Sequence, residues 1–227
     1  MYIDMHCHSV SSDDSRAPVE QYLKWIQVLR RRGYRVDGIF LTEHRKFDGD
    51  RDYRELGQKY GVLVLKGSEL DTRFGHFLVY NVTPALVSKV DFVDVAMDPF
   101  RLIAEAEACG ALAVPAHPGR FGIGLCDFLS QGVPLGPIRV VERLNGSSRK
   151  GENERAEEIC LSMGLAGIGG SDAHFVSSIG SCLTEFKCPV RDERDVVAAL
   201  RSGQFRAVRL EETRESVPTV KPASSKD

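Results

Sequence analysis

The sequence predicts a single α/β domain built around a largely parallel sheet. Short runs rich in Val, Ile and Leu alternate with longer segments of helical periodicity, which is the pattern of β/α alternation. A chain of 227 residues is long enough for one well-buried core. With 42% hydrophobic and 27% charged residues, the composition is that of an ordinary globular protein. We therefore expect one domain over residues 1–210.

Seven apolar runs are predicted strands, and six helical segments lie between or after them. Pro18 suits the first turn of a helix, and Gly33 and Gly110 follow helices where a left-handed residue is often needed. The expected strands are Tyr2–His6, Gly38–Thr42, Val62–Ser68, His76–Asn81, Ala111–Pro115, Arg139–Arg143 and Leu165–Gly169. The expected helices are Pro18–Arg32, Asp52–Tyr60, Pro99–Cys109, Gly124–Ser130, Glu152–Met163 and Arg191–Ser202.

Charge and composition limit the classes of protein that fit. The formal net charge is −2, so no chain-wide basic field is available to hold a long nucleic acid. No run approaches the ~20 apolar residues that cross a bilayer. The six cysteines form no C-x-x-C pair, and the start of the chain lacks the pattern of a signal peptide, so we expect a reduced, cytoplasmic protein. Residues 211–227 are polar, and we expect a flexible tail there.

The six histidines fall at or beside predicted strand ends. His6 and His8 end the first strand and point to the same side, because side chains alternate along a strand. This H-x-H pair alone could equally be accidental. Four further groups follow other strands, and the carboxyl ends of parallel strands share one edge, so we expect all five to converge. These groups are Thr42-Glu43-His44, Gly67-Ser68-Glu69 with His76, Ala116-His117-Pro118, and Ser171-Asp172-Ala173-His174.

Taken in order, these motifs resemble those of the polymerase and histidinol phosphatase (PHP) domain family. The resemblance runs from residue 4 to about residue 208. It rests on His6-Cys7-His8-Ser9 with Ser12-Asp13, Thr42-Glu43-His44, Gly67-Ser68-Glu69, His76, His117-Pro118 and Gly170-Ser171-Asp172-Ala173-His174. It implies a distorted seven-stranded (β/α)7 barrel and a trinuclear metal site in a metal-dependent phosphoesterase.

The resemblance also implies which residues hold the metals. One cation is expected on His6, His8, Glu69 and Asp172. Glu69 is expected to bridge to a second, because a carboxylate offers two oxygens, and His76 and His117 complete it. The third is expected on Asp13, His44 and His174. Histidine-rich sites suit zinc, manganese or iron, and the mixed nitrogen and oxygen donors do not choose among them.

Three positions depart from the family pattern. Asp14 stands where a glycine commonly follows Asp13, so either carboxylate could be the ligand. Glu43 stands where the family usually has aspartate, which could alter a hydrogen bond behind the metals. Arg45 follows His44 where a small or acidic residue is common, and it is either a phosphate contact or a surface charge.

The expected activity is hydrolysis of a phosphomonoester, short nucleotide or oligonucleotide by a metal-activated water. Arg120, Arg143 and Arg45 are candidates for binding substrate phosphate, and Asn145 is either a substrate contact or a turn residue. We expect no membrane partner and no obligatory protein partner. The catalytic set, acting through the metals, is expected to be His6, His8, Glu69, His117, Asp172 and His174.

Three other functions stay open at this point. One is an exonuclease on RNA or DNA ends. Another is a non-catalytic metal-stabilised interaction domain, although every ligand position of the family is filled. The third is amide or ester hydrolysis, but amidohydrolase-like barrels usually carry a metal-bridging lysine, and the bridging candidate here is Glu69.

Overall fold

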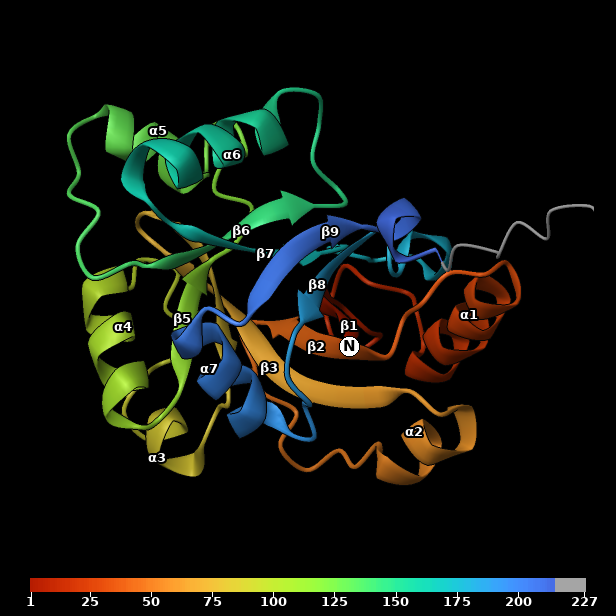
Figure 1. The fold of residues 1–227 in the computed structure, drawn as a ribbon. Helices are drawn as coiled ribbons and strands as arrows, with labels where there is room; N and C mark the ends of the chain where they lie inside the picture. Colours follow the sequence, from red (N-terminus) through yellow and green to blue (C-terminus); the bar gives the residue numbers. More distant parts are fainter. Residues whose placement is uncertain (215–227) are drawn as a thin grey trace, which may run out of the picture.

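Nine strands form two sheets in the computed structural model, which describes residues 1–214. The larger sheet holds seven strands in the order β5-β4-β3-β2-β1-β8-β9, and β6 pairs with β7 in the smaller one. The helices lie outside the curled sheets (Figure 1). The strands are β1 (Tyr2–Cys7), β2 (Gly38–His44), β3 (Leu63–Thr72), β4 (Gly75–Tyr80), β5 (Leu112–Pro115), β6 (Val140–Asn145), β7 (Ala166–Gly170), β8 (Cys182–Phe186) and β9 (Phe205–Arg209).

The pairing of the strands makes the larger sheet mixed. β1 is parallel to β2, and β2 is parallel to β3. β4 is antiparallel to both of its neighbours, β3 and β5. β8 is antiparallel to both β1 and β9, and β6 is parallel to β7. The α/β class is confirmed. The expected seven-stranded (β/α)7 barrel is not confirmed, because the strands form a curled, mixed sheet with a separate two-stranded sheet beside it.

All seven predicted strands and all six predicted helices are present, with boundaries that shift by a few residues. The sequence analysis missed β8, β9 and the short helix α3. Residues 210–213 form the 3-10 helix η2, in which Thr213 is buried and accepts a hydrogen bond from the Arg35 N–H. Residues 215–227 of the predicted tail lie outside the described residues. The helices are α1 (Val19–Arg31), α2 (Arg54–Tyr60), α3 (Pro84–Val87), α4 (Pro99–Ala108), α5 (Leu125–Ser130), α6 (Glu152–Met163) and α7 (Glu193–Ser202).

The inner side of the curled sheet holds a core that α7 closes at the amino-terminal ends of the strands. Met5, Phe40 and Leu78 come from three strands and share one buried cluster with Val196 and Val197 of α7. Figure 1 shows α7 on the same side of the sheet as the N-terminus. This arrangement leaves the opposite, carboxyl edge of the parallel strands free for a site. In residues 1–214, no helix combines the length and the apolar character that crossing a membrane requires.

Leu78→Ala is expected to lower the free energy of unfolding by about 2–5 kcal/mol, because it removes a fully buried side chain from this core and leaves a cavity. Urea denaturation followed by circular dichroism measures the change. The matched control is Leu161→Ala on α6, where the leucine is 76% exposed and the expected change is below about 0.5 kcal/mol. Equal effects of the two substitutions would contradict the assignment of Leu78 to the core.

Candidate metal centre

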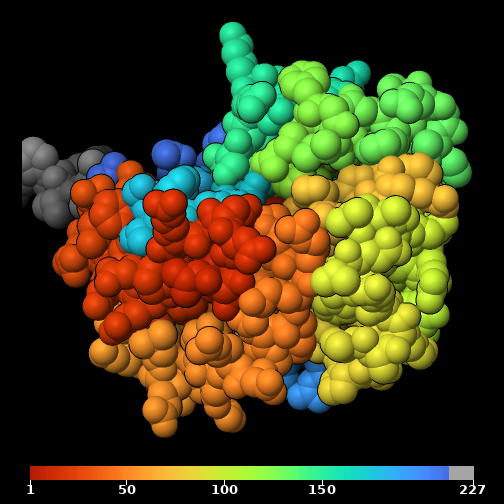
Figure 2. All heavy atoms as spheres, turned by 180° about the vertical axis from the view of Figure 1, so that it is seen from behind, coloured from red at the N-terminus to blue at the C-terminus, as the bar shows by residue number. Residues whose placement is uncertain are grey.

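Histidine and carboxylate side chains converge at the carboxyl edge of the central strands. β1, β2 and β3 run in parallel to this edge, and β4 begins there because it is antiparallel to β3. Seen from behind (Figure 2), the red segment near the N-terminus lies on one face beside orange segments. Three groups of donors that could each hold a metal ion are present: His6, His8, Glu69 and Asp172; Glu69, His76 and His117; and His8, His44 and His174.

The first group is fully enclosed by the protein. The Glu69 Oε2 atom lies 3.0 Å from His6 Nε2 and 3.2 Å from His8 Nε2. The Asp172 Oδ1 atom lies 3.4 Å and 3.3 Å from the same two nitrogens. The two Nε2 atoms are only 3.0 Å apart, and two lone pairs facing each other at that distance repel unless a proton or a cation lies between them.

The second group uses the other oxygen of the same glutamate. Glu69 Oε1 lies 3.0 Å from His76 Nδ1 and 3.0 Å from His117 Nε2. The two oxygens of Glu69 therefore face two different sets of imidazoles. This is the arrangement of a bridging carboxylate, as the family resemblance implied for this residue.

The third group stands nearer to solvent. The rings of His8 and His44 stack with centroids 4.2 Å apart, and those of His8 and His174 lie 4.4 Å apart. Asp14 Oδ2 lies 3.3 Å from His44 Nε2 and 3.1 Å from His174 Nε2. Of the two adjacent carboxylates that the sequence left open, both are exposed, and it is Asp14, not Asp13, that lies beside these imidazoles.

Charge and burial set the protonation of the cluster. Burial lowers the pKa of His6, but the charges of Glu142, Asp172 and Glu69 outweigh it and raise that pKa well above its usual value. For Glu69, burial raises the pKa, and the charge of His6 together with the hydrogen bonds of the surrounding imidazoles brings it well below its usual value. Burial lowers the pKa of His44 to about 4, so this ring is neutral at pH 7. In the absence of metal, protons on the imidazoles supply part of the positive charge that the carboxylates require.

The donor set fits divalent cations. Imidazole nitrogens and carboxylate oxygens in one enclosed cluster are the ligands of zinc, manganese and iron in proteins. His117 and Asp172 also hold left-handed backbone conformations, with φ of 28° and 52°. Such conformations cost on the order of 1–3 kcal/mol for residues other than glycine and collect at functional sites. Two of the candidate ligands are therefore placed by a strained backbone conformation.

The sequence analysis missed Glu142, which lies fully buried on β6 behind the cluster. Its Oε1 atom is 3.0 Å from His6 Nδ1, and its Oε2 atom accepts hydrogen bonds from the His117 N–H and from Asn145 Nδ2. The signal in the sequence was a charged residue inside an apolar run, Val140-Val141-Glu142. Asn145, considered as a substrate contact or a turn residue, also donates to Asp172 Oδ2 at 3.3 Å.

The three candidate arginines lie in different places. Arg120 donates to Asp172 Oδ2 at 2.7 Å and is 26% exposed, so it borders the cluster. Arg45 lies at the rim, 3.5 Å from Asp71 Oδ2. The structure does not bring Arg143 to the cluster, because its guanidinium pairs with Glu157 of α6 at 2.9 Å on the outer side of the sheet.

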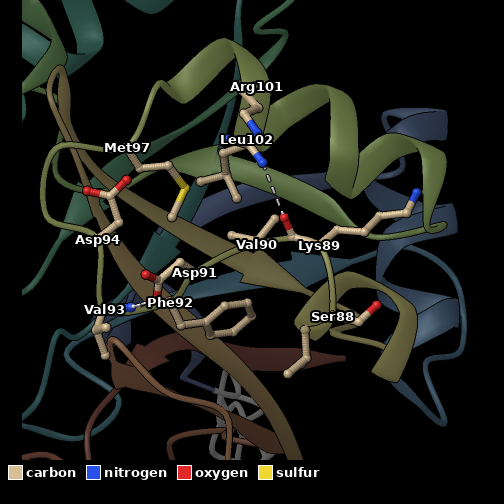
Figure 3. A pocket seen from close by; sticks show the side chains of 11 residues that line it. Ser88, Lys89, Val90, Asp91, Phe92, Val93, Asp94, Met97, Arg101 and Leu102 are labelled. Carbon is tan, nitrogen blue, oxygen red and sulfur yellow. Dashed lines mark hydrogen bonds between the residues drawn. The ribbon is translucent and has the colours of Figure 1, made fainter.

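Two cavities show where ligands have room. A recess of about 210 Å³ lies next to the cluster and is lined by Asp71, His76, Ile123 and Phe128 among others. A larger cavity, of about 500 Å³, lies around the segment between α3 and α4 (Figure 3). It carries Lys89 and Arg101 but no histidine, so it is separate from the candidate metal centre.

One segment of the chain matches a known protein family, and the fold matches solved structures. The family described as PHP-associated (PHP_C) matches residues 150–205, a segment that includes Asp172 and His174. PsfC from Pseudomonas syringae PB-5123 is 21% identical, with a TM-score of 0.67 over 93% of this chain and 92% of PsfC. No curated protein matches the sequence significantly.

Two larger proteins contain the same fold. A two-domain protein from Bacteroides vulgatus ATCC 8482, which contains a predicted PHP-like metal-dependent phosphoesterase, is 24% identical, with a TM-score of 0.59 over 93% of this chain and 65% of that protein. The lesion-specific endonuclease PfuEndoQ from Pyrococcus furiosus is 15% identical, with a TM-score of 0.63 over 91% of this chain and 57% of the endonuclease. The chain thus spans less than two thirds of either protein.

Proposed function

We propose that the chain is a hydrolase of the PHP domain family that cleaves phosphate esters with divalent metal ions. The observation that carries the proposal is the convergence of six imidazoles with Glu69 and Asp172 at one edge of the sheet. We assign it phosphomonoesters or short nucleotides, because a formal net charge of −2 offers little attraction for a long phosphate polymer. The same centre acting on RNA or DNA ends is the alternative.

Three divalent cations are the number that the donor groups favour. His6, His8, Glu69 and Asp172 would hold the first, and Glu69 with His76 and His117 the second. His44 and His174 would hold the third, together with Asp14 as a further ligand. When bound, such cations supply Lewis-acid charge to phosphoryl oxygens and lower the pKa of a water molecule toward neutrality.

Arg120 is the protein group best placed to bind the substrate phosphate. Asp172 and Asn145 accept from one of its nitrogens, and within residues 1–214 the other two nitrogens have no side-chain hydrogen-bond partner, so they are available to a ligand at the border of the cluster. Burial lowers the pKa of Arg120, but the charge of Asp172 outweighs it and raises that pKa, so the guanidinium stays charged. A planar guanidinium matches two phosphate oxygens at once.

Arg120→Met is expected to lower kcat/KM for a phosphomonoester by about 10–100-fold, because it removes a charged hydrogen-bond donor of about 1.5–3 kcal/mol. The matched control is Arg143→Met, since Arg143 pairs with Glu157 away from the cluster. Steady-state kinetics of both variants with added Mn²⁺ make the comparison. Similar losses in the two variants would remove Arg120 from the substrate site.

A substrate screen tests the proposed function directly. Protein freed of metal and reloaded with Mn²⁺ or Zn²⁺ is offered phosphomonoesters, mononucleotides, 5′-labelled RNA and DNA oligonucleotides, and simple amides and lactones. Release of inorganic phosphate that His117→Ala abolishes supports the proposal. Shortened oligonucleotides without phosphate release support the nuclease alternative. Metal binding by the wild type, with equal, background-level phosphate release from wild type and His117→Ala, supports a non-catalytic interaction domain.

A further inference from the structure

We propose that Glu142 is a positioning residue that orients His6 and His117 toward Glu69 and thereby sets the affinity of the cluster for its metals. The inference rests on the proposed function in taking the cluster as a metal centre. Glu142 itself belongs to none of the three donor groups, because it lies behind His6 on β6. Its role would therefore be exerted through the two histidines that it contacts.

Both oxygens of Glu142 are engaged. Oε1 lies 3.0 Å from His6 Nδ1, while Oε2 accepts from the His117 N–H at 2.7 Å and from Asn145 Nδ2 at 3.0 Å. In the described part of the chain, His6 is the one charged partner of this fully buried carboxylate. Even a paired and hydrogen-bonded buried carboxylate adds little net stability compared with apolar residues, so a glutamate here is poorly explained by stability alone.

The contact with His6 fixes which ring nitrogen is free for a metal. A carboxylate accepts a hydrogen bond from Nδ1–H, which leaves the lone pair on Nε2. That Nε2 atom is the one that faces Glu69, His8 and Asp172. A carboxylate behind a ligating imidazole also makes the imidazole a stronger base.

The contact with His117 holds a strained turn. The φ angle of His117 is 28°, outside the range that most residues adopt, and its N–H points to Glu142. The turn carries the imidazole to within 3.0 Å of Glu69 Oε1. A charge-assisted hydrogen bond to the backbone is a direct way to keep this conformation. Glu142 thus contacts one candidate ligand in each of two donor groups: His6 in the first and His117 in the second.

Glycine at position 170 leaves the room that this contact needs. A Cβ atom on Gly170 would lie 2.4 Å from His6 Cβ and 2.8 Å from Glu142 Oε1. Gly170 has no left-handed backbone, so close approach, not conformation, is what requires glycine here. The contact between His6 on β1 and Glu142 on β6 therefore depends on the glycine of β7 beside it.

The test compares metal affinity in Glu142→Gln and Glu152→Gln. A glutamine offers one acceptor oxygen, so it cannot serve both the His6 Nδ1–H and the His117 N–H. Competition with a chromophoric chelator for Zn²⁺ and Mn²⁺ is expected to show affinity lowered by about 10–100-fold in Glu142→Gln. Saturating metal is expected to restore most of kcat. Glu152 is a matched buried control, since its carboxylate bonds the Phe121 and Arg149 N–H groups outside the cluster.

Two results would overturn the inference. One is unchanged metal affinity in a folded Glu142→Gln variant, and the other is an equal loss in Glu152→Gln. If Glu142→Gln does not fold, the wild type still decides: long-range ¹⁵N–¹H spectra of the zinc-loaded protein are expected to place the His6 proton on Nδ1, and a proton on Nε2 refutes the role. Absence of phosphate-ester cleavage with the affinity difference intact would refute the proposed function and leave the role of Glu142 standing.

Discussion

Glu69→Gln is expected to lower kcat/KM for phosphate esters by about a thousandfold or more. Glu69 is fully buried, and its two oxygens face different imidazole sets: His6 and His8 on one side, His76 and His117 on the other. An amide keeps one acceptor oxygen and no charge, so one donor group loses its Glu69 oxygen and both donor groups lose the negative charge. Loss of several kcal/mol of charge stabilisation corresponds to a factor of this size.

The measurement pairs kinetics with metal content. Glu69→Gln and the control Glu157→Gln are loaded with Mn²⁺, their metal is counted by atomic emission, and kcat/KM is determined for the best substrate of the screen. Glu157 is 41% exposed on α6 and pairs with Arg143, so its substitution is expected to change neither quantity beyond about twofold. A Glu69→Gln variant with full metal content and more than a tenth of wild-type activity would refute the bridging role.

Most of the donor residues could be predicted from the sequence because the strands that they follow are easy to recognise. Buried parallel strands appear as short apolar runs, and a polar residue that directly follows such a run must lie at the carboxyl edge. His6, Glu69 and His117 each follow this rule, and the structure brings them together. Convergence of side chains far apart in the chain thus followed from strand direction alone.

The elements that the sequence did not reveal lack that periodic signal. β9 carries two exposed arginines in a five-residue run, Phe205-Arg206-Ala207-Val208-Arg209, and it pairs only with β8 at the edge of the sheet. β8 in turn pairs with β1, which is far away in sequence. These pairings depend on tertiary contacts, and short antiparallel edge strands with charged residues give little local evidence of them.

Two local choices were also beyond the pattern. Asp13 and Asp14 are adjacent in a loop, and only the loop's backbone decides which of them meets His44 and His174. Glu142 and Arg143 are adjacent in a strand, so they must point to opposite sides. Once Glu142 bonds His6 inside the sheet, Arg143 has to face α6.

The affinity of the metal-free protein for divalent cations is expected to rise steeply with pH, by up to about 100-fold per pH unit between pH 6.5 and 9. Burial lowers the pKa of His8, but the hydrogen bonds of Asp172 and Glu69 and the charge of Glu69 outweigh it and raise that pKa to about 9. The pKa of His6 is also raised. Metals bind neutral imidazole, so two protons must leave, and each contributes about tenfold per pH unit.

The sign of the effect is fixed by these pKa values. A raised histidine pKa stabilises the metal-free fold fully below the unfolded value of about 6.5, and this stabilisation is lost as pH rises through about 9. The protons that stabilise the metal-free fold are therefore the competitors of the metal, and the contribution of His8 to the slope ends as pH rises past about 9. Glu69 and Asp172 have lowered pKa values and are already ionised in this range, so they add nothing to the pH dependence of the metal affinity.

Calorimetry of Zn²⁺ or Mn²⁺ binding in buffers of different ionisation enthalpy counts the released protons at pH 6.5, 7.5 and 8.5, and chelator competition gives the affinity at each pH. At least two protons are expected to be released at pH 7.5. His6 and His8 each release one, and for His76 burial lowers the pKa but Glu69 outweighs it and raises that pKa as well. His44 contributes none, because its pKa of about 4 leaves it neutral throughout. A flat affinity with no proton release would mean that His6 and His8 are not held by their carboxylate neighbours in the way that the distances of 3.0–3.4 Å imply.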